Sequence, residues 1–351
     1  MNMKLEMKIF KYALYITVIF FNISCTEIDN ETHSEVFGLP HVAIEMRESD
    51  FADLKKNALL NEYAAITIER GGIKESGKIR RRGNSSRALP KPSFHIKTDG
   101  GDWHYVASNI DKSYCKEVFA NIAFEKFGGF LVQKTEFVAL SINNIYQGLY
   151  ISREPIDEKF FQRRSIGINS LYRIRYGGMF TFKDGHNSAV DFEKLVPQSS
   201  VNYDDLNTLI SALDKNDSEK IKNILNIENA AKYSFISSVI GNFDGITNNI
   251  HIYNAKKDNK FRIIPYDLDL TFWTINKFEN GLLERAEDIY LSEYGLKREQ
   301  CIDSTSRYIG SLVGVLDSLK NKISQAYEND PYLQGENLDW HISQIKRRIS
   351  R

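Results

Sequence analysis

The stretch from Asn242 to Phe272, NFDGITNNIHIYNAKKDNKFRIIPYDLDLTF, carries most of the chemistry that this sequence offers. It begins where an apolar helix ends at Gly241, and its pattern predicts a polar loop, a strand, a turn and a second strand. A hairpin brings the outer ends of its two strands together. We therefore expect Asp267, which follows the second strand, to lie beside Asp244 and Asn249, which precede the first.

The oxygen-bearing side chains of this stretch suit a divalent cation. The carboxylates of Asp267 and Asp269 and the amide oxygen of Asn249 are hard ligands of the kind that bind Mg²⁺ or Mn²⁺. Asp244 stands five residues before Asn249, which is the spacing of the catalytic aspartate and a metal-binding asparagine in protein kinases. The alternative is that aspartate and asparagine occur here only because loops favour them.

The composition is that of an ordinary globular protein. The chain has 351 residues, of which 42% are hydrophobic and 26% are charged, and this length is enough for two lobes. Because the formal net charge is zero, nothing in the overall charge points to nucleic acid, and we expect no nucleic-acid partner. Cys115 and Cys301 are expected to be buried thiols, although the sequence leaves a pairing between them open.

The N-terminal residues 1–25 are predicted to be an export signal. Three lysines precede an apolar run at residues 12–21 that is too short to span a bilayer. Cys25 follows this run after a small residue, an arrangement that resembles the lipobox of bacterial lipoproteins. We therefore predict lipidation of Cys25, a tether over residues 26–40, and an exported lipoprotein anchored in the outer membrane or elsewhere in the cell envelope. The alternative is a plain signal peptide or membrane anchor with an incidental cysteine.

A basic loop follows the predicted strands of the N-terminal region, which lie at residues 41–46, 64–68, 77–81 and 93–97. The loop, RRRGNSSRALPKP, contains a glycine-containing turn whose backbone N–H groups could hold a phosphate. Arg82 and, at the end of the next strand, Lys97 add positive charge, and Lys97 stands where protein kinases carry a phosphate-binding lysine. The candidate phosphate-binding residues are therefore Arg82, Asn84, Ser85 and Lys97. The alternative is a basic surface loop.

Further kinase-like features follow this loop along the chain. A helix is predicted over residues 111–127, and its Glu117 or Glu125 could pair with Lys97, as a helix glutamate does in kinases. The segment from Arg153 to Ile156 follows a strong hairpin signal and would form the hinge beside an adenine. Glu154 is therefore a candidate nucleotide-binding residue.

The second half of the chain is predicted to be mainly helical. Residues 165–200 are expected to be an insertion with short strands, and residues 274–300 to be polar loops near the mouth of the site. Residues 157–164 begin the second lobe, and the predicted helices cover residues 204–213, 218–225, 229–240, 307–327 and 338–351.

Taken together, these segments resemble the spore-coat CotH kinase family, a group of atypical protein-kinase-like proteins. The resemblance covers roughly residues 77–272 and implies an α+β bilobal kinase-like fold, with a β-rich N-lobe over residues 41–153 and a mainly helical C-lobe over residues 154–351. The matching residues are Arg82 to Ser86, Lys91, Ile96, Lys97, Asp111 to Gly128, Leu140 to Glu154, Asn242 to Asp244, Asn249, Tyr253 and Phe261 to Phe272.

The resemblance implies Mg²⁺/ATP-dependent phosphorylation of serine or threonine on a protein substrate. Asp244 matches the catalytic aspartate, Asn249 and Asp267 match metal positions, and Lys97 matches a phosphate-binding lysine. Phe261 falls where the family tends to carry an aromatic side chain against the adenine, although phenylalanine replaces the more usual tryptophan. The sequence has no G-x-G-x-x-G loop, so the rules of ordinary kinases do not transfer whole.

Two other functions stay open. An exported kinase-like chain could be a non-catalytic surface lipoprotein for binding or assembly, which the 18 tyrosines and 21 phenylalanines would suit. The same site could also transfer a nucleotidyl group instead of a phosphoryl group. ATP is scarce outside the cytoplasm, which favours the non-catalytic alternative, whereas acidic clusters are costly to bury without a cation, which favours a metal-dependent enzyme.

Overall fold

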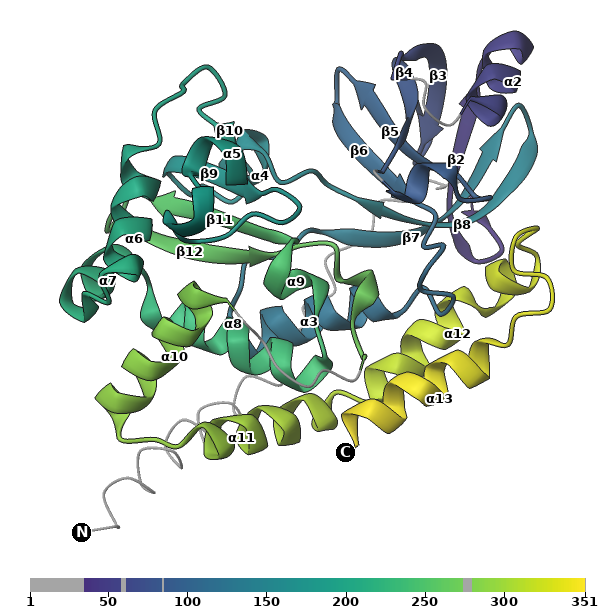
Figure 1. Cartoon of the computed structure of the whole chain (residues 1–351). Coiled ribbons are helices and arrows are strands. Elements are labelled where there is room, and N and C mark those ends of the chain that lie inside the picture. The colour runs from purple at the N-terminus through teal and green to yellow at the C-terminus, as the bar shows by residue number, and fades with distance from the viewer. Residues whose placement is uncertain (1–34, 58–60, 84, 274–279, 351) are drawn as a thin grey trace. The chain divides into compact units, whose positions relative to one another are not determined.

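The computed structural model describes residues 35–57, 61–83, 85–273 and 280–350, and Figure 1 shows their arrangement. An N-terminal part rich in strands is followed by a mainly helical part that carries a second sheet. The predicted α+β class, with a β-rich N-lobe and a mainly helical C-lobe, is confirmed. The predicted signal peptide, the lipidation site Cys25 and the loop residue Asn84 lie outside the described residues.

The predicted tether ends earlier than residue 40, because strands begin at Glu35 and the side chain of Leu39 is fully buried. Eight strands form the first sheet, in the order β1-β2-β3-β4-β5-β6-β8-β7, and a parallel pairing of β2 with β7 closes it. The strands are β1 (Glu35–Val36), β2 (Leu39–Glu45), β3 (Ala64–Arg70), β4 (Ile73–Arg82), β5 (Ser93–Thr98), β6 (Gly101–Val106), β7 (Thr135–Ile142) and β8 (Ile145–Arg153).

The closed sheet surrounds its own apolar core, because alternate side chains of each strand point inward. On β3, for example, Ile66 and Ile68 are buried while the residue between them is not. The turn between β7 and β8 forms as predicted, and Asn143 and Asn144 both have positive φ, at 50° and 62°. The other members of this core are Val42, Ile44, Phe51, Leu54, Ile79, Phe94, Ile96, Tyr105, Ala107, Val138, Leu140, Ile142 and Tyr150.

Helix α3 (Lys116–Gly128) is buried around most of its surface and joins the two lobes. It begins five residues later than predicted, because Asp111 first forms a turn in which its carboxylate accepts the backbone N–H groups of Ser113 and Lys116, at 3.0 Å and 2.9 Å. The ring of Phe124 on α3 packs on the ring of Tyr233 in the C-terminal lobe, with 5.1 Å between centroids. The position of α3 thus depends on both lobes.

The second sheet has the order β10-β9-β11-β12, and its strands are β9 (Ile168–Ile174), β10 (Phe192–Val196), β11 (Ile250–Ala255) and β12 (Lys260–Pro265). The short strands predicted within residues 165–200 are confirmed as β9 and β10, but these residues are not a separate insertion, because β9 lies in the middle of this sheet and pairs with β11. The side chains of Leu171 and Tyr172 on β9 are fully buried. Their partner strand lies about eighty residues further along the chain, so local sequence patterns could not reveal the pairing.

The helices confirm most of the predicted positions and correct two. Residues 281–294 form a helix, whereas loops were predicted, and the predicted helix at residues 307–327 is two helices that meet at Leu312 and Val313. None of the described helices is long and apolar enough to cross a membrane. The remaining helices are α2 (Glu48–Lys56), α4 (Glu158–Gln162), α5 (Ser188–Asp191), α6 (Asp204–Asp214), α7 (Ser218–Ile224), α8 (Ile227–Ile240), α9 (Asp244–Thr247), α10 (Gly281–Tyr294), α11 (Arg298–Ser311), α12 (Gly314–Glu328) and α13 (Leu338–Ile349).

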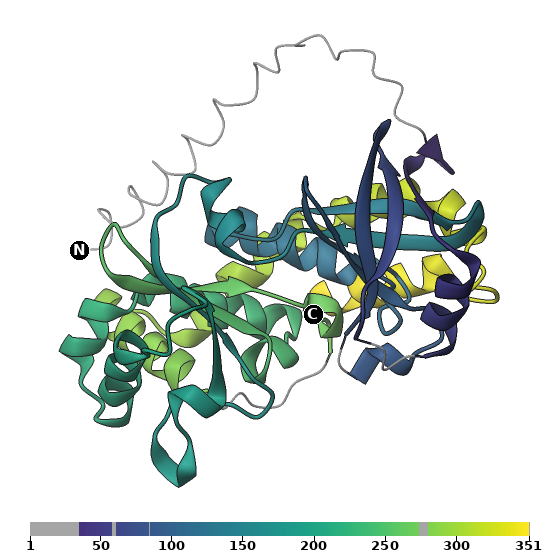
Figure 2. The same cartoon turned by 90° about the horizontal axis from the view of Figure 1, so that it is seen from above.

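The C-terminal helix pair, α12 and α13, returns to the N-terminal lobe. Figures 1 and 2 both show these helices (yellow) alongside the strands β7 and β8 rather than beside the second sheet. The hydroxyl of Tyr146 on β8 donates to the backbone carbonyl of Ala326 on α12, at 3.3 Å. The last part of the chain therefore supports the lobe that the first part forms.

Candidate active site

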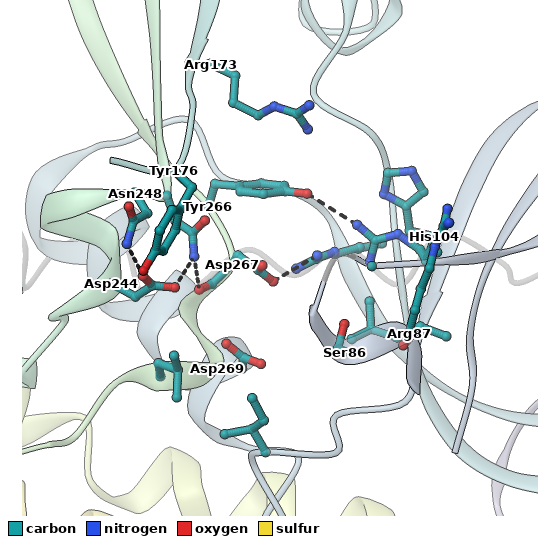
Figure 3. A pocket seen from close by; sticks show the side chains of 18 of the residues that line it. Ser86, Arg87, His104, Arg173, Tyr176, Asp244, Asn248, Tyr266, Asp267 and Asp269 are labelled. Atoms are coloured by element: carbon teal, nitrogen blue, oxygen red, sulfur yellow. Dashed lines mark hydrogen bonds and ion pairs between the residues drawn. The ribbon is translucent and has the colours of Figure 1, made fainter. Parts of the chain in front are cut away.

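A cavity of about 1000 Å³ is lined by residues of both lobes, and Figure 3 shows it from close by. One wall comes from the N-terminal strands and the loop after β4, and it is rich in arginine and histidine. The opposite wall comes from β9 and the segment after it. The floor comes from the residues just before β11 and just after β12, which flank the open end of this hairpin. The polar and charged residues of the lining include Arg80, Arg82, Ser86, Arg87, Ser93, His95, His104, Ser108, Asn109, Arg153, Arg173, Arg175, Tyr176, Asp244, Asn248, Asn249, Tyr266, Asp267 and Asp269.

The hairpin brings its acidic ends together as predicted. Ile250 at the start of β11 pairs with Pro265 at the end of β12. The side-chain amide of Asn249 donates to a carboxylate oxygen of Asp244 at 2.7 Å and to the backbone carbonyl of Asp267 at 3.5 Å. The proximity of Asp244, Asn249 and Asp267 is therefore confirmed.

Asp244 is the first residue of the short helix α9, and its carboxylate has two amide donors. Asn248 donates to one carboxylate oxygen at 2.8 Å, and Asn249 donates to the other at 2.7 Å. The chain enters this loop through Gly241, whose φ is +61° and whose position has no room for a Cβ atom, since one would lie 2.1 Å from the carbonyl oxygen of Trp273. These contacts fix both the position and the orientation of the Asp244 carboxylate.

Arg153 is the central cation of the site, and the sequence reasoning missed its role. It ends β8 with a side chain that is only 1% exposed, and its guanidinium forms ion pairs with Glu117 on α3 and with Asp267, the latter at 3.0 Å. It also lies over the ring of Tyr266, 5.0 Å from the centroid. The signal that could have revealed it is an arginine that directly ends a run of buried apolar residues, because a cation in that place needs an acidic partner.

The predicted pairing of Glu117 or Glu125 with Lys97 is wrong. Glu117 pairs with Arg153, while the ammonium group of Lys97 lies 3.7 Å from the carboxylate of Asp102. The side chain of Lys97 is 48% exposed and does not line the cavity. It lies on the same face of β5 as His95, which lines the cavity, but two residues further along the strand, where the cavity has ended. The lobes are thus joined by an arginine on β8 and not by a lysine on β5.

Two other candidate nucleotide contacts lie outside the cavity. Glu154 is buried, where its carboxylate pairs with Arg163 and Arg164 and accepts the backbone N–H of Lys134 at 2.9 Å, so it fastens the end of β8 to α4. Phe261 on β12 is 1% exposed and belongs to the core. Its side chain is enclosed because β12 is covered by neighbouring elements on that face, which the sequence alone does not show.

The basic loop contributes two residues that the predictions did not favour. Ser86 and Arg87 line the cavity together with Arg82, although neither is among the predicted phosphate-binding residues. Arg87 donates to the side chain of Asn61 at 2.7 Å, and Arg82 donates to the hydroxyl of Tyr266 at 3.3 Å. Ser85 begins the 3₁₀ turn of residues 85–88.

The charges at the floor shift the pKa values of two aspartates in opposite directions. Burial alone would raise the pKa of Asp267, but the positive charges of Arg153 and Arg82 outweigh it and hold the pKa below its usual value. Burial raises the pKa of Asp269 well above its usual value, and the neighbouring charges of Asp267 and Glu117 add to this effect. The floor therefore has more carboxylate groups than its cations neutralise.

The donor chemistry of this floor fits a divalent cation. Its candidate donors are the carboxylates of Asp267 and Asp269 and the amide oxygen of Asn249, which are the oxygen ligands that Mg²⁺ and Mn²⁺ prefer. One carboxylate oxygen of Glu117 is buried and has no hydrogen-bond donor among the described residues. The described residues contain no compact group of three histidine, cysteine or acidic side chains that could hold a metal ion. A metal site here therefore needs the amide oxygen of Asn249 as an additional ligand.

The cleft lies between a β-rich lobe and a helical lobe, and it holds an Asp-x₄-Asn loop and an aspartate that follows the next hairpin. This is the organisation of a kinase-like protein. The sequence model of the CotH kinase protein family matches residues 79–350, and the chain belongs to this family. It is also similar to the inner spore coat protein H of Bacillus subtilis (strain 168), with 23% identity over 260 residues, which cover 67% of this chain and 69% of that protein.

Two solved structures match about three quarters of the chain at low similarity. The Golgi casein kinase matches with a TM-score of 0.38 and 11% identity, over 74% of this chain and 68% of the kinase chain. The proinflammatory kinase CtkA of Helicobacter pylori matches with a TM-score of 0.37 and 9% identity, over 77% of this chain and 90% of its own.

Proposed function

We propose that the protein is a phosphotransferase that uses ATP with Mg²⁺ or Mn²⁺ to phosphorylate serine or threonine on a protein substrate. One observation carries this proposal: Asp244, Asn249 and Asp267 meet at the floor of a cavity whose facing wall is basic. Phosphoryl transfer requires positioned oxygens, cations and a proton acceptor more than it requires a nucleophilic side chain.

The basic wall supports the binding of a nucleotide. Arg82 and Arg87 on the loop after β4 could neutralise phosphate oxygens, and guanidinium groups bind such oxygens in pairs. The cavity volume of about 1000 Å³ is at the upper end of the range for small-molecule sites, which leaves room for ATP and part of an acceptor chain.

The acidic floor supports the transfer step. Asp267 and Asp269, with the amide oxygen of Asn249, would hold the metal ion, which when bound neutralises charge on the phosphate oxygens. Asp244 would accept the proton of the acceptor hydroxyl as the hydroxyl oxygen forms its bond to the γ-phosphorus and the bond to ADP breaks. The amides of Asn248 and Asn249 keep the Asp244 carboxylate turned toward the cavity.

Labelled nucleotide tests the proposal against its two alternatives. The protein from Thr26 onward is incubated with Mg²⁺ and with ATP labelled at either the α- or the γ-phosphate. Transfer of label from the γ position alone supports a kinase, and transfer from the α position indicates a nucleotidyl transferase. If neither label is transferred, the protein is a kinase-like binding or assembly module.

Cys25 is the basis of a separate proposal, that the chain is exported and anchored to a membrane of the cell envelope as a lipoprotein. We expect Cys25→Ala to move the protein from the membrane fraction to the soluble fraction, because acyl chains contribute about 0.8 kcal/mol per buried CH₂ group. The measurement is fractionation followed by extraction with high salt and carbonate. A variant that stays in the membrane through both extractions contradicts lipid anchoring.

Arg82 should be more important for nucleotide affinity than Lys97, because only Arg82 lines the cavity. A charge-assisted contact contributes about 1.5–3 kcal/mol, so Arg82→Ala should weaken the binding of Mg·ATP by about tenfold to a hundredfold. Lys97→Ala should bind as wild type does and serves as the matched control, since it removes one cation from the neighbouring strand. Calorimetric titration measures both, and equal losses in the two variants would contradict this assignment.

His95 should make the fold sensitive to acid. Burial lowers its pKa to about 4, although a hydrogen bond from its ring to Asp102 opposes the effect. The unfolded chain, whose histidines titrate near 6.5, therefore binds more protons between these values, and the contribution of His95 to stability is full above pH 6.5 and is lost as pH falls toward 4. We expect the melting temperature of His95→Gln to fall less than that of wild type between pH 7.5 and pH 5. His341→Gln on α13, which does not line the cavity, is the control, and equal falls in all three proteins would contradict the prediction.

A further inference from the structure

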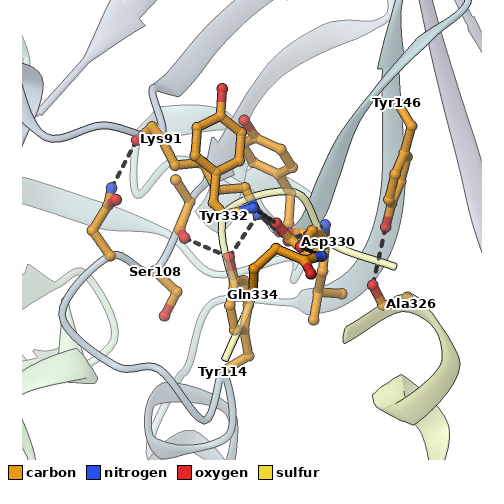
Figure 4. Close-up of polar contacts among 12 residues, drawn as sticks. Lys91, Ser108, Tyr114, Tyr146, Ala326, Asp330, Tyr332 and Gln334 are labelled. Carbon is orange, nitrogen blue, oxygen red and sulfur yellow. Dashed lines mark hydrogen bonds and ion pairs between the residues drawn. The ribbon is translucent and has the colours of Figure 1, made fainter. Parts of the chain in front are cut away.

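A buried ion pair fastens the turn between α12 and α13 to the N-terminal lobe, as Figure 4 shows. The ammonium group of Lys91, which lies near the end of the basic loop, donates to a carboxylate oxygen of Asp330 at 2.5 Å. The two side chains are only 2% and 0% exposed, although they lie 239 residues apart in the sequence. Neither residue lines the cavity.

The polar groups of this pair are fully used. Lys91 also donates to the hydroxyl of Tyr114 at 2.7 Å and to the backbone carbonyl of Leu149 at 2.6 Å, so each of its three hydrogens has an acceptor. Asp330 also accepts the backbone N–H groups of Leu149 and Tyr332, both at 2.8 Å. A buried ion pair is retained at low cost only where such additional hydrogen bonds exist.

The surroundings are shaped to receive the pair. The ammonium group lies 4.5 Å from the ring centroid of Tyr150, and the rings of Tyr114 and Tyr332 are at 5.1 Å and 5.8 Å. Gly148 on β8 has a φ of +112°, and a Cβ atom there would lie 2.4 Å from a carboxylate oxygen of Asp330 and 2.7 Å from the Lys91 nitrogen. The strand therefore leaves space for this ion pair by having no side chain at that position.

The pair is connected to the cavity wall through short hydrogen bonds. The backbone carbonyl of Lys91 accepts the side-chain amide of Asn109 at 2.7 Å. A second path runs through Tyr114, which accepts a hydrogen bond from the Lys91 ammonium group and donates its hydroxyl to the carbonyl of Ala107 at 2.6 Å. The N–H of Ala107 in turn donates to the hydroxyl of Ser93 at 2.9 Å. Ser93 and Asn109 line the cavity, as does Ser108 between these contacts.

We propose that Lys91 and Asp330 are positioning residues of the nucleotide site, through which the C-terminal helix pair holds the wall formed by Ser93, Ser108 and Asn109. The inference rests on the proposed function, because the ligand that this wall would hold is the nucleotide. The C-terminal helix pair, α12 and α13, would thus take part in ligand binding although it contributes no residue to the cavity lining.

The test removes the pair without leaving one charge buried alone. The double variant Lys91→Met/Asp330→Leu replaces both partners by apolar groups of similar size, which a fold tolerates better than the loss of one partner. A wall displaced by a fraction of an ångström should weaken the binding of Mg·ATP by about tenfold and raise KM by the same factor, while kcat changes little because Asp244 and Asp267 are untouched. A purely structural role would lower the melting temperature and leave the affinity of the folded protein unchanged.

Two further variants make the result specific. Gly148→Ala drives a Cβ atom into the pair from β8 and should weaken nucleotide binding in the same way, which keeps the test possible if the double variant fails to fold. Lys346→Met/Asp317→Leu removes an ion pair of 2.7 Å that joins α12 and α13 to each other and does not contact the Lys91 segment. This control should bind Mg·ATP as wild type does.

Amide hydrogen exchange gives a reading that does not depend on the nucleotide. The N–H of Ala107 should exchange faster in the double variant and in Gly148→Ala than in wild type or in the α12–α13 control. Wild-type affinity in both test variants overturns the proposal. If wild type itself does not bind Mg·ATP, the proposed function fails, and unchanged exchange at Ala107 would then overturn the positioning role as well.

Discussion

Asp244→Asn is expected to lower the kcat of phosphoryl transfer by about a hundredfold to ten-thousandfold, which is the usual contribution of a positioned proton acceptor. The asparagine side chain keeps the size and most of the hydrogen-bonding shape of the aspartate, but it cannot take the proton of the acceptor hydroxyl. The affinity for Mg·ATP should change much less than kcat, because the proposed role of Asp244 is toward the acceptor hydroxyl and not toward the nucleotide. Transfer of γ-labelled phosphate and calorimetric titration measure the two effects separately.

The same hairpin supplies the control for this substitution. Asp258 lies in the turn at the opposite end of β11 and β12, where its carboxylate pairs with Arg262 at 2.5 Å. Asp258→Asn makes the same chemical change in the same hairpin and should keep the activity of wild type. If Asp244→Asn and Asp258→Asn are equally active, Asp244 is not the proton acceptor.

Arg153→Met is expected to damage both stability and activity. It leaves Glu117 as an unpaired buried carboxylate, and removing one partner of a buried ion pair costs about 3–5 kcal/mol. It also frees Asp267 from its ion pair and separates the floor of the site from α3. Urea unfolding measures the loss of stability, and label transfer measures the loss of activity.

A second substitution separates the two effects of Arg153. In Arg153→Met/Glu117→Gln the glutamine is uncharged, so most of the stability should return, while the activity should stay low because Asp267 still lacks its cation. If Arg153→Met alone is as stable as wild type, then Glu117 and Arg153 do not depend on each other in the way the structure indicates.

The acidic floor was the most predictable part of the molecule. Asp244, Asn249 and Asp267 lie on one hairpin, and the geometry of a hairpin follows from its own strands and turn. The turn at Asn143 and Asn144 was predictable for the same reason, since its signal is two adjacent residues that tolerate positive φ.

The cations of the site could not be predicted in the same way, because their positions depend on contacts between distant segments. Lys97 has the residue type and the strand position expected of a phosphate-binding lysine, but the cavity ends before it reaches that part of β5. Arg153 has its partners 36 residues earlier and 114 residues later in the chain, so only the packing of α3 against the hairpin brings Glu117 and Asp267 to it. The enclosure of Phe261 likewise depends on the elements that cover β12.

The parallel pairing of β2 with β7 sets an upper limit on how much of the N-terminal part of the chain can be removed. The family match begins at residue 79, inside β4, yet β2 is hydrogen-bonded to β3 on one side and to β7 on the other. A shortened protein that starts at residue 79 would lack β1, β2, β3 and more than half of β4, and β7 would be left with an open row of backbone donors and acceptors. Such an edge pairs readily with other chains, so the shortened protein should self-associate, and the smallest autonomous unit begins upstream of Leu39 rather than at the boundary of sequence similarity.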